Sequence, residues 1–130
     1  MDEKEKKDLE ELKLQKEDRD KRIKAEVRRL NSLFSKMDKS VKKVVKSLIE
    51  NVAFMAVTLA DLQEHINIHG VTDKYQNGEN QWGTKKSPEV EIHISMTKNH
   101  NSTMKQLADL LPKRSLKPED DGFEDFENER

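Results

Sequence analysis

The chain has 130 residues, of which 32% are hydrophobic and 39% are charged, with a formal net charge of −1 and no cysteine. This composition excludes a disulfide framework and a thiolate metal site, and it leaves too few apolar residues for a large core. The charge-free run 51–60 is far shorter than the roughly 20 residues that cross a bilayer, and the charged N-terminus predicts no secretory signal.

Charge is segregated along the chain. Residues 1–18 have a net charge of −3, residues 19–46 of +8, residues 47–118 of zero and residues 119–130 of −6. The first 18 residues are almost wholly charged and have no wide apolar face, so we expect them to be frayed or disordered. Residues 19–36 are predicted to form a helix, because Ile23, Val27, Leu30 and Phe34 repeat at steps of four, three and four.

A longer helix is predicted over 41–69. Its apolar residues follow steps of four and three without a break from Val41 to Ile66, after a cap at Asp38 or Ser40, and Gly70 is a natural stop. In its middle, apolar residues fall on nearly every face, so we expect copies of the chain to cover them. The residues expected to be buried within and between subunits are Val45, Leu48, Val52, Phe54, Met55, Val57 and Leu59.

The helical pattern breaks over 70–87. Residues 71–75 and Gln81-Trp82 are predicted to be partner strands around a turn at Asn77-Gly78. Ser87-Pro88 starts a further helix, predicted over 88–111, which Pro112 ends. Tyr75 and Trp82 could stack bases, but we favour their closing the open end of the helical hairpin.

Together these elements predict an all-α fold. It is a long antiparallel helical hairpin with an additional N-terminal helix and a short connector resembling a β-hairpin. The expected division is a disordered N-terminus over 1–18, a helical oligomerisation and DNA-binding domain over 19–112, and a disordered acidic tail over 113–130.

The segment 19–46, called the basic block below, is the strongest functional signal. Clustered lysine and arginine side chains neutralise phosphates and release counterions. A solvated helix face is the alternative, and nothing in the block predicts base-specific contacts. The residues expected to contact DNA are Arg19, Lys21, Arg22, Lys24, Arg28, Arg29, Lys39, Lys42, Lys43 and Lys46. The acidic tail either folds onto a basic partner through Phe123 and Phe126 or merely solubilises the chain.

Evidence for catalysis is weak. His65 and His69 are four residues apart and could share a metal ion, but a third ligand and an HExxH motif are lacking. We therefore expect no metal, no cofactor and no enzymatic activity, and a metal-dependent enzyme using this histidine pair stays as a lesser hypothesis.

Three stretches resemble the small subunit of phage terminases, in the branch found with HK97-like phages. They are AFMAVTLADL at 53–62, YQNGENQWGTKKSPEV at 75–90 and KQLADLLP at 105–112. The connector, with its NGxNQ(aromatic)G and KSPxV pieces, is the specific part. The N-terminal 18 residues and the acidic tail lie outside the resemblance.

The resemblance implies a non-catalytic DNA-packaging factor, encoded by a phage and acting in the host cytoplasm. Such a protein forms a ring-shaped homo-oligomer, binds double-stranded viral DNA and delivers it to the large terminase subunit, which carries the ATPase and the nuclease. Many small terminases have a separate N-terminal helix-turn-helix domain, for which the basic region here is too short. The alternative is a structural coiled-coil or scaffolding protein without a nucleic-acid role.

Overall fold

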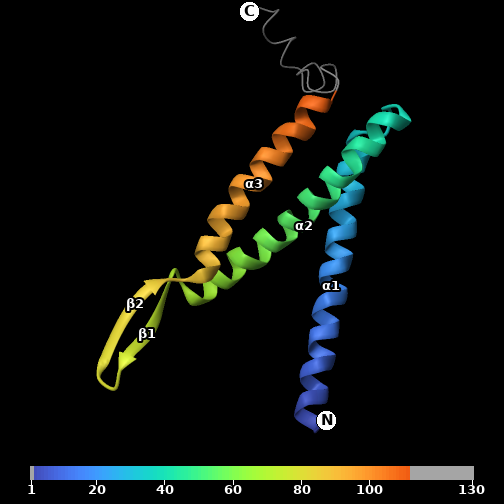
Figure 1. The fold of residues 1–130 in the computed structure, drawn as a ribbon. Coiled ribbons are helices and arrows are strands. Elements are labelled where there is room, and N and C mark those ends of the chain that lie inside the picture. The colour runs from blue at the N-terminus through green and yellow to red at the C-terminus, as the bar shows by residue number, and fades with distance from the viewer. Residues whose placement is uncertain (1, 112–130) are drawn as a thin grey trace, which may run out of the picture.

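The computed structural model of the chain describes residues 2–111 (Figure 1). The order of elements is α1 (Glu3–Leu33), α2 (Lys39–His69), β1 (Thr72–Gly78), β2 (Gln81–Lys86) and α3 (Pro88–Leu110). Helix α2 is central: α1 packs on it, and α3 returns beside it in the opposite direction. The predicted helical hairpin with a two-stranded connector is confirmed, and the fold is mostly helical.

Helix α1 begins earlier than predicted, which corrects the expectation of disorder for residues 3–18. The carboxylate of Asp2 caps the helix by accepting the Glu5 N–H at 2.8 Å, and Glu3 and Glu5 lie at its positive end. Lys16 and Asp20, four residues apart, pair at 3.0 Å. The side chains of residues 2–18 are nevertheless exposed, and Figure 1 shows this half of α1 leaving α2. Local charge pairing and capping, not docking, therefore account for the extension.

The core lies where the C-terminal half of α1 and the helix α3 meet the N-terminal half of α2. Ile49 is fully buried there, and Phe34 is 2% exposed. The predicted apolar stripes lie in or against this core from Val27 to Phe34 and from Val41 to Met55, as amphipathic periodicity requires. The buried cluster consists of Leu30, Phe34, Val45, Ile49, Val52, Met55 and Leu107.

The ends of α2 and α3 follow the sequence signals, with one difference. Asp38 caps α2 by accepting the Val41 N–H at 2.9 Å, and Gly70 ends it at a φ of +81°, which a side chain would disfavour. Ser87 occupies the cap position of α3, but its hydroxyl donates to the Glu89 carboxylate at 2.6 Å instead of capping the backbone. The Ser87 N–H donates to the Val71 carbonyl at 3.0 Å, which ties the two ends of the connector together.

The connector is an antiparallel β-hairpin that projects beyond the helices (Figure 1). Its two-residue loop is Glu79-Asn80, so the predicted turn at Asn77-Gly78 is displaced by an irregularity between Gln76 and Gly78. Tyr75 pairs across the strands with Gly83, and a Cβ at Gly83 would lie 2.7 Å from Tyr75 Cζ. The tyrosine ring therefore lies over a glycine, and this close approach fixes the register.

Candidate nucleic-acid interface

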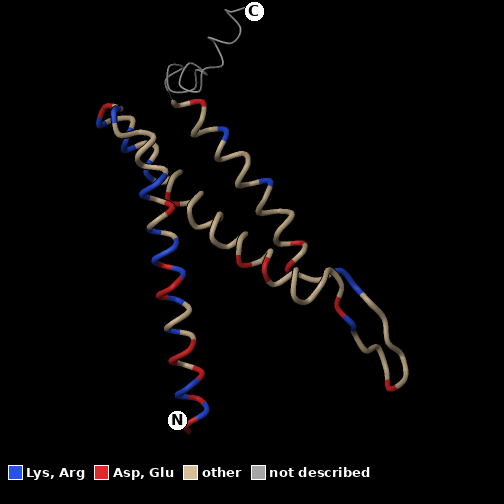
Figure 2. The backbone as a smooth tube through the Cα atoms, turned by 180° about the vertical axis from the view of Figure 1, so that it is seen from behind, with Lys and Arg blue, Asp and Glu red and all other residues tan. Residues whose placement is uncertain are grey.

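The basic block, residues 19–46, runs from the middle of α1 through the turn at one end of the molecule into the start of α2. The Phe34 N–H donates to the Asn31 carbonyl at 3.0 Å, and the Met37 N–H donates to the Phe34 carbonyl at 3.1 Å. The buried Phe34 ring anchors this turn in the core, and the Asp38 cap then starts α2 at once. Basic residues of α1 and of α2 thereby lie on either side of a short turn (Figure 2).

The start of α2 breaks the usual rule for helix termini. The positive end of a helix dipole favours acidic residues, yet the first turn of α2 contains none. Lys39, Lys42 and Lys43 lie there instead, and all three are exposed. Like charges at this end destabilise the helix unless an anion binds them, and rule-breaking of this kind is typical of functional sites.

Asp38 offsets only part of this positive charge, because it supplies a single carboxylate, which also caps the helix. The Val41 N–H and then the Ser40 hydroxyl hold the pKa of Asp38 below its usual range. The carboxylate is thus ionised at neutral pH and occupied as a cap. Five lysines surround it within residues 36–46, namely Lys36, Lys39, Lys42, Lys43 and Lys46.

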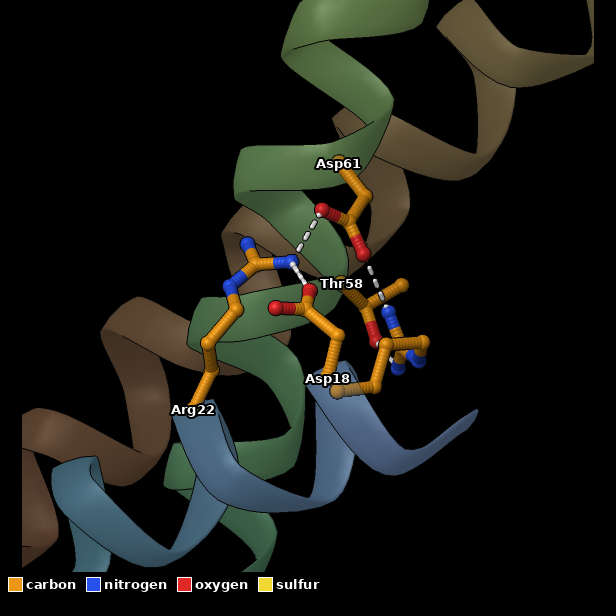
Figure 3. A network of polar contacts seen from close by, with 5 residues as sticks. Asp18, Arg22, Thr58 and Asp61 are labelled. Atoms are coloured by element: carbon orange, nitrogen blue, oxygen red, sulfur yellow. Dashed lines mark hydrogen bonds and ion pairs between the residues drawn. The ribbon is translucent and has the colours of Figure 1, made fainter. Parts of the chain in front are cut away.

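Two of the predicted DNA-binding arginines are engaged within the chain (Figure 3). Arg19 donates to Asp61 at 2.5 Å and to the Thr58 hydroxyl at 2.9 Å, and its guanidinium lies 5.7 Å from the centre of the Phe54 ring. Arg22 donates to the other oxygen of Asp61 at 2.8 Å. Both arginines therefore hold α1 against α2, a role that the sequence analysis missed.

Two further predicted bases have acidic neighbours. Arg29 donates twice to Glu26, at 2.5 and 3.1 Å, and these hydrogen bonds lower the pKa of Glu26 despite its partial burial. Lys46 lies 4.0 Å from Glu50, and both side chains are well exposed. The exposed Lys46–Glu50 pair is therefore weak, and Lys46 can turn to an anion at little cost.

The remaining predicted bases are exposed and make no ion pair within residues 2–111. They are Lys21, Lys24, Arg28, Lys39, Lys42 and Lys43. Lys36, in the turn itself, is also exposed and without an ion pair in residues 2–111, although it was not among the predicted DNA-binding residues. Four of these exposed bases lie in the turn and at the start of α2. We call them the lysine cluster: Lys36, Lys39, Lys42 and Lys43.

A groove of about 630 Å³ lies beside the lysine cluster, between α1 and α2. The partly exposed Val27 lines it, and Phe34, Val45 and Ile49, each at most 2% exposed, lie beneath its floor. Lys42 and Lys43 also line it, together with Lys46, and Asn31, Ser35 and Glu50 complete the lining. This basic groove therefore combines an apolar surface with ammonium groups. Sequence periodicity alone did not indicate it, because it depends on how α1 crosses α2.

The predicted oligomer-interface residues divide into two groups. Val45, Val52, Met55 and Val57 are at most 6% exposed, so they are buried within the single chain. The expected contacts between copies stay a prediction. Phe54 is 48% exposed, and Leu48 and Leu59 are half-buried.

The expected packing of Tyr75 and Trp82 against the helices is corrected by the hairpin. Trp82 is 67% exposed and Tyr75 is 40% exposed. Trp82 shares one face of the hairpin with Lys74 and Thr84, because residues two apart along a strand point the same way. An aromatic side chain and a lysine are therefore presented to solvent at the far end of α2 from the lysine cluster.

The histidine pair forms no metal centre among the described residues. The rings of His65 and His69 lie 4.3 Å apart, and Glu89 lies 3.7 Å from His65 Nε2. In residues 2–111, no group of three or more potential ligands is placed to hold a metal ion. No helix in this part of the chain is long and apolar enough to span a membrane.

Phe123 and Phe126, the expected anchors of the acidic tail, lie outside the described residues. Comparisons with protein families, with curated proteins and with solved structures found no match to this chain.

Proposed function

We propose that this chain is a non-catalytic, double-stranded-DNA-binding subunit of a viral packaging machine, of the small-terminase kind. The observation that carries the proposal is the lysine cluster at the start of α2. Four exposed lysines without an ion pair in the described residues surround the positive end of a helix, where acidic residues would be more stable. A polyanion relieves that repulsion.

The geometry favours contacts with phosphate over contacts with bases. Lysine is a flexible point charge, and phosphate contacts position a protein on DNA without reading its sequence. Arg28 on α1 adds an exposed guanidinium from the neighbouring helix, and α1 and α2 share the buried cluster around Phe34 and Val45. Binding by such a surface depends steeply on salt, because each neutralised phosphate releases counterions.

Homo-oligomerisation is the second part of the proposal. Exposed apolar side chains remain on all three helices, including Val44 at 62%, Phe54 at 48% and Ile92 at 48% exposure. Contact with a second copy would remove such residues from water. The ring form, the viral origin in a host cytoplasm and delivery of DNA to a large ATPase and nuclease subunit rest on the resemblance of the connector and its flanking helices.

The test combines mass and binding measurements on the full chain. Native mass spectrometry should give a closed assembly of several copies, and titration with double-stranded DNA at two salt concentrations should give a steep loss of affinity with salt. Assembly without DNA binding would instead support the structural coiled-coil or scaffolding role. A folded monomer at micromolar concentration that does not bind DNA would refute both parts of the proposal.

A further inference from the structure

The basic groove has features that DNA does not need. A phosphate backbone requires positive charge, but this groove also has the partly exposed Val27 in its wall, above the buried Phe34, Val45 and Ile49. Aromatic or aliphatic side chains fill such a surface, and acidic groups nearby would pair with Lys42, Lys43 and Lys46. A segment that combines carboxylates with aromatic residues therefore fits the groove better than a nucleic acid does.

We infer that the basic groove binds the acidic C-terminal segment of its own chain, residues 119–130. This segment has seven acidic residues and one arginine, and its only aromatic residues are Phe123 and Phe126. The two phenylalanines contact Val27 and the aliphatic parts of the lysines that line the groove, and the carboxylates around them pair with the ammonium groups of these lysines. The segment thus matches the groove in both charge and hydrophobicity.

The C-terminal segment starts close enough to reach the groove. Leu111 packs against the core cluster that contains Phe34 and Val45, and both of these residues line the groove. Figure 1 shows α3 ending at the same end of the molecule as the α1–α2 turn. Eleven residues lie between Leu111 and Phe123, and the extended chain between these two residues spans up to about 40 Å, several times the roughly 10 Å diameter of a helix.

Docking of this segment would compete with DNA for the groove lysines. This consequence rests on the proposed DNA-binding function. Lys42 and Lys43 cannot pair with tail carboxylates and with DNA phosphates at the same time. The docked segment would therefore lower the apparent affinity for DNA, in proportion to the fraction of molecules whose groove it occupies. A segment of a dozen residues pays an ordering cost on docking, so its occupancy is reversible and DNA can displace it.

The first experiment measures docking without DNA. The chain has no cysteine, so the pair Ser35→Cys and Glu127→Cys can be joined by a short bis-maleimide in the otherwise full-length protein. Ser35 lines the groove, and residue 127 follows Phe126. We expect efficient cross-linking within one chain. The matched control, Asn80→Cys with Glu127→Cys, places the first cysteine at the hairpin tip and should not cross-link.

Two results of this experiment would overturn the inference. Absence of the cross-link would show that the segment does not lie in the groove. A cross-linked dimer in place of a cross-linked monomer would show that the occupant is the tail of a second copy. Adding Phe123→Ala and Phe126→Ala to the cross-linking pair should abolish the product, and persistence of the product would contradict the role of the aromatic side chains.

The second experiment measures competition with DNA. Phe123→Ala with Phe126→Ala leaves the charge of the tail unchanged, so long-range repulsion of DNA is unaltered. We expect at least a threefold gain in DNA affinity, because the groove is freed. Unchanged DNA affinity in a variant that has lost the cross-link would contradict the competition. If neither protein binds DNA, the cross-link still supports docking while the proposed function fails.

Discussion

Arg22 Nη1 lies 2.8 Å from Asp61 Oδ1, so a base of the predicted DNA-binding set is used to join α1 to α2. Arg19 reaches the other carboxylate oxygen of Asp61 from one turn earlier in α1. One acidic side chain on α2 thus receives two arginines where the helices begin to diverge (Figures 1 and 3). Beyond this point α1 has no buried side chain.

Asp61→Asn should destabilise the docking of α1 on α2. It removes the charge that both arginines share, and because the Asp61 side chain is 40% exposed, we expect a loss of about 1 kcal/mol in the free energy of unfolding. Thermal or urea unfolding at equal protein concentration measures it. Asp18→Asn is the matched control, because Asp18 only meets Arg22 at 3.4 Å and is 67% exposed. Equal losses in both variants would contradict the role of Asp61.

The same carboxylate should make stability depend on acid pH. Partial burial raises the pKa of Asp61, but the hydrogen bonds from Arg22 and Arg19 outweigh it and lower the pKa in the folded chain. Asp61 therefore contributes stability that is complete above its unfolded pKa of about 4 and is lost as the pH falls through the folded value. The unfolding temperature should fall less steeply below pH ~4 in Asp61→Asn than in the parent. Parallel pH profiles would show that Asp61 does not titrate as described.

Ile49→Ala should be strongly destabilising. Ile49 is fully buried between α1, α2 and α3, and truncation leaves a cavity that costs about 2 to 5 kcal/mol. Val44→Ala, five residues earlier on the same helix, is the control: Val44 is 62% exposed, and its truncation should cost within ~0.5 kcal/mol in the single chain. Chemical unfolding measures both. A large loss for Val44→Ala that depends on protein concentration would instead place Val44 between copies.

Gly83→Ala should disturb the projecting hairpin. The added methyl group would lie 2.7 Å from Tyr75 Cζ, so the tyrosine ring must move or the strands must separate. Amide hydrogen exchange in β1 and β2 should become faster, while exchange in the helices stays unchanged. Tyr75→Ala combined with Gly83→Ala should restore slower exchange, since it removes the clash. Unchanged exchange in Gly83→Ala alone would contradict the ring position.

Much of the fold follows from local sequence signals. The periodicity from Val41 to Ile66, the Gly70 stop and the Ser87-Pro88 start all act within one or two turns of backbone, and the bounds of α2 and α3 agree with them. The start of α1 was missed because its stability comes from the Asp2 cap and charge pairs, whereas the prediction required an apolar face. The hairpin turn was displaced because the Tyr75–Gly83 pair, not the Asn-Gly dipeptide, sets the register.

The candidate site was predictable only as a list of charges. Sequence spacing identifies Arg19 and Lys42 equally as bases on helical faces, but their surroundings depend on the packing of α1 against a residue some 40 positions away. The partner Asp61 looks like an ordinary surface acid in the sequence. Likewise, the basic groove exists only once Phe34 and Ile49 are brought together across the turn.

The salt dependence of DNA binding tests the central claim most directly, because the structure separates the lysine cluster from the other exposed lysines. Lys42→Ala with Lys43→Ala should reduce the slope of log affinity against log salt by about 1.8, since each lost phosphate contact removes about 0.9. Lys6→Ala with Lys7→Ala removes the same charge from the exposed start of α1 and should leave the slope unchanged. A slope equally reduced in both variants, or unchanged in both, would contradict a DNA interface at the start of α2.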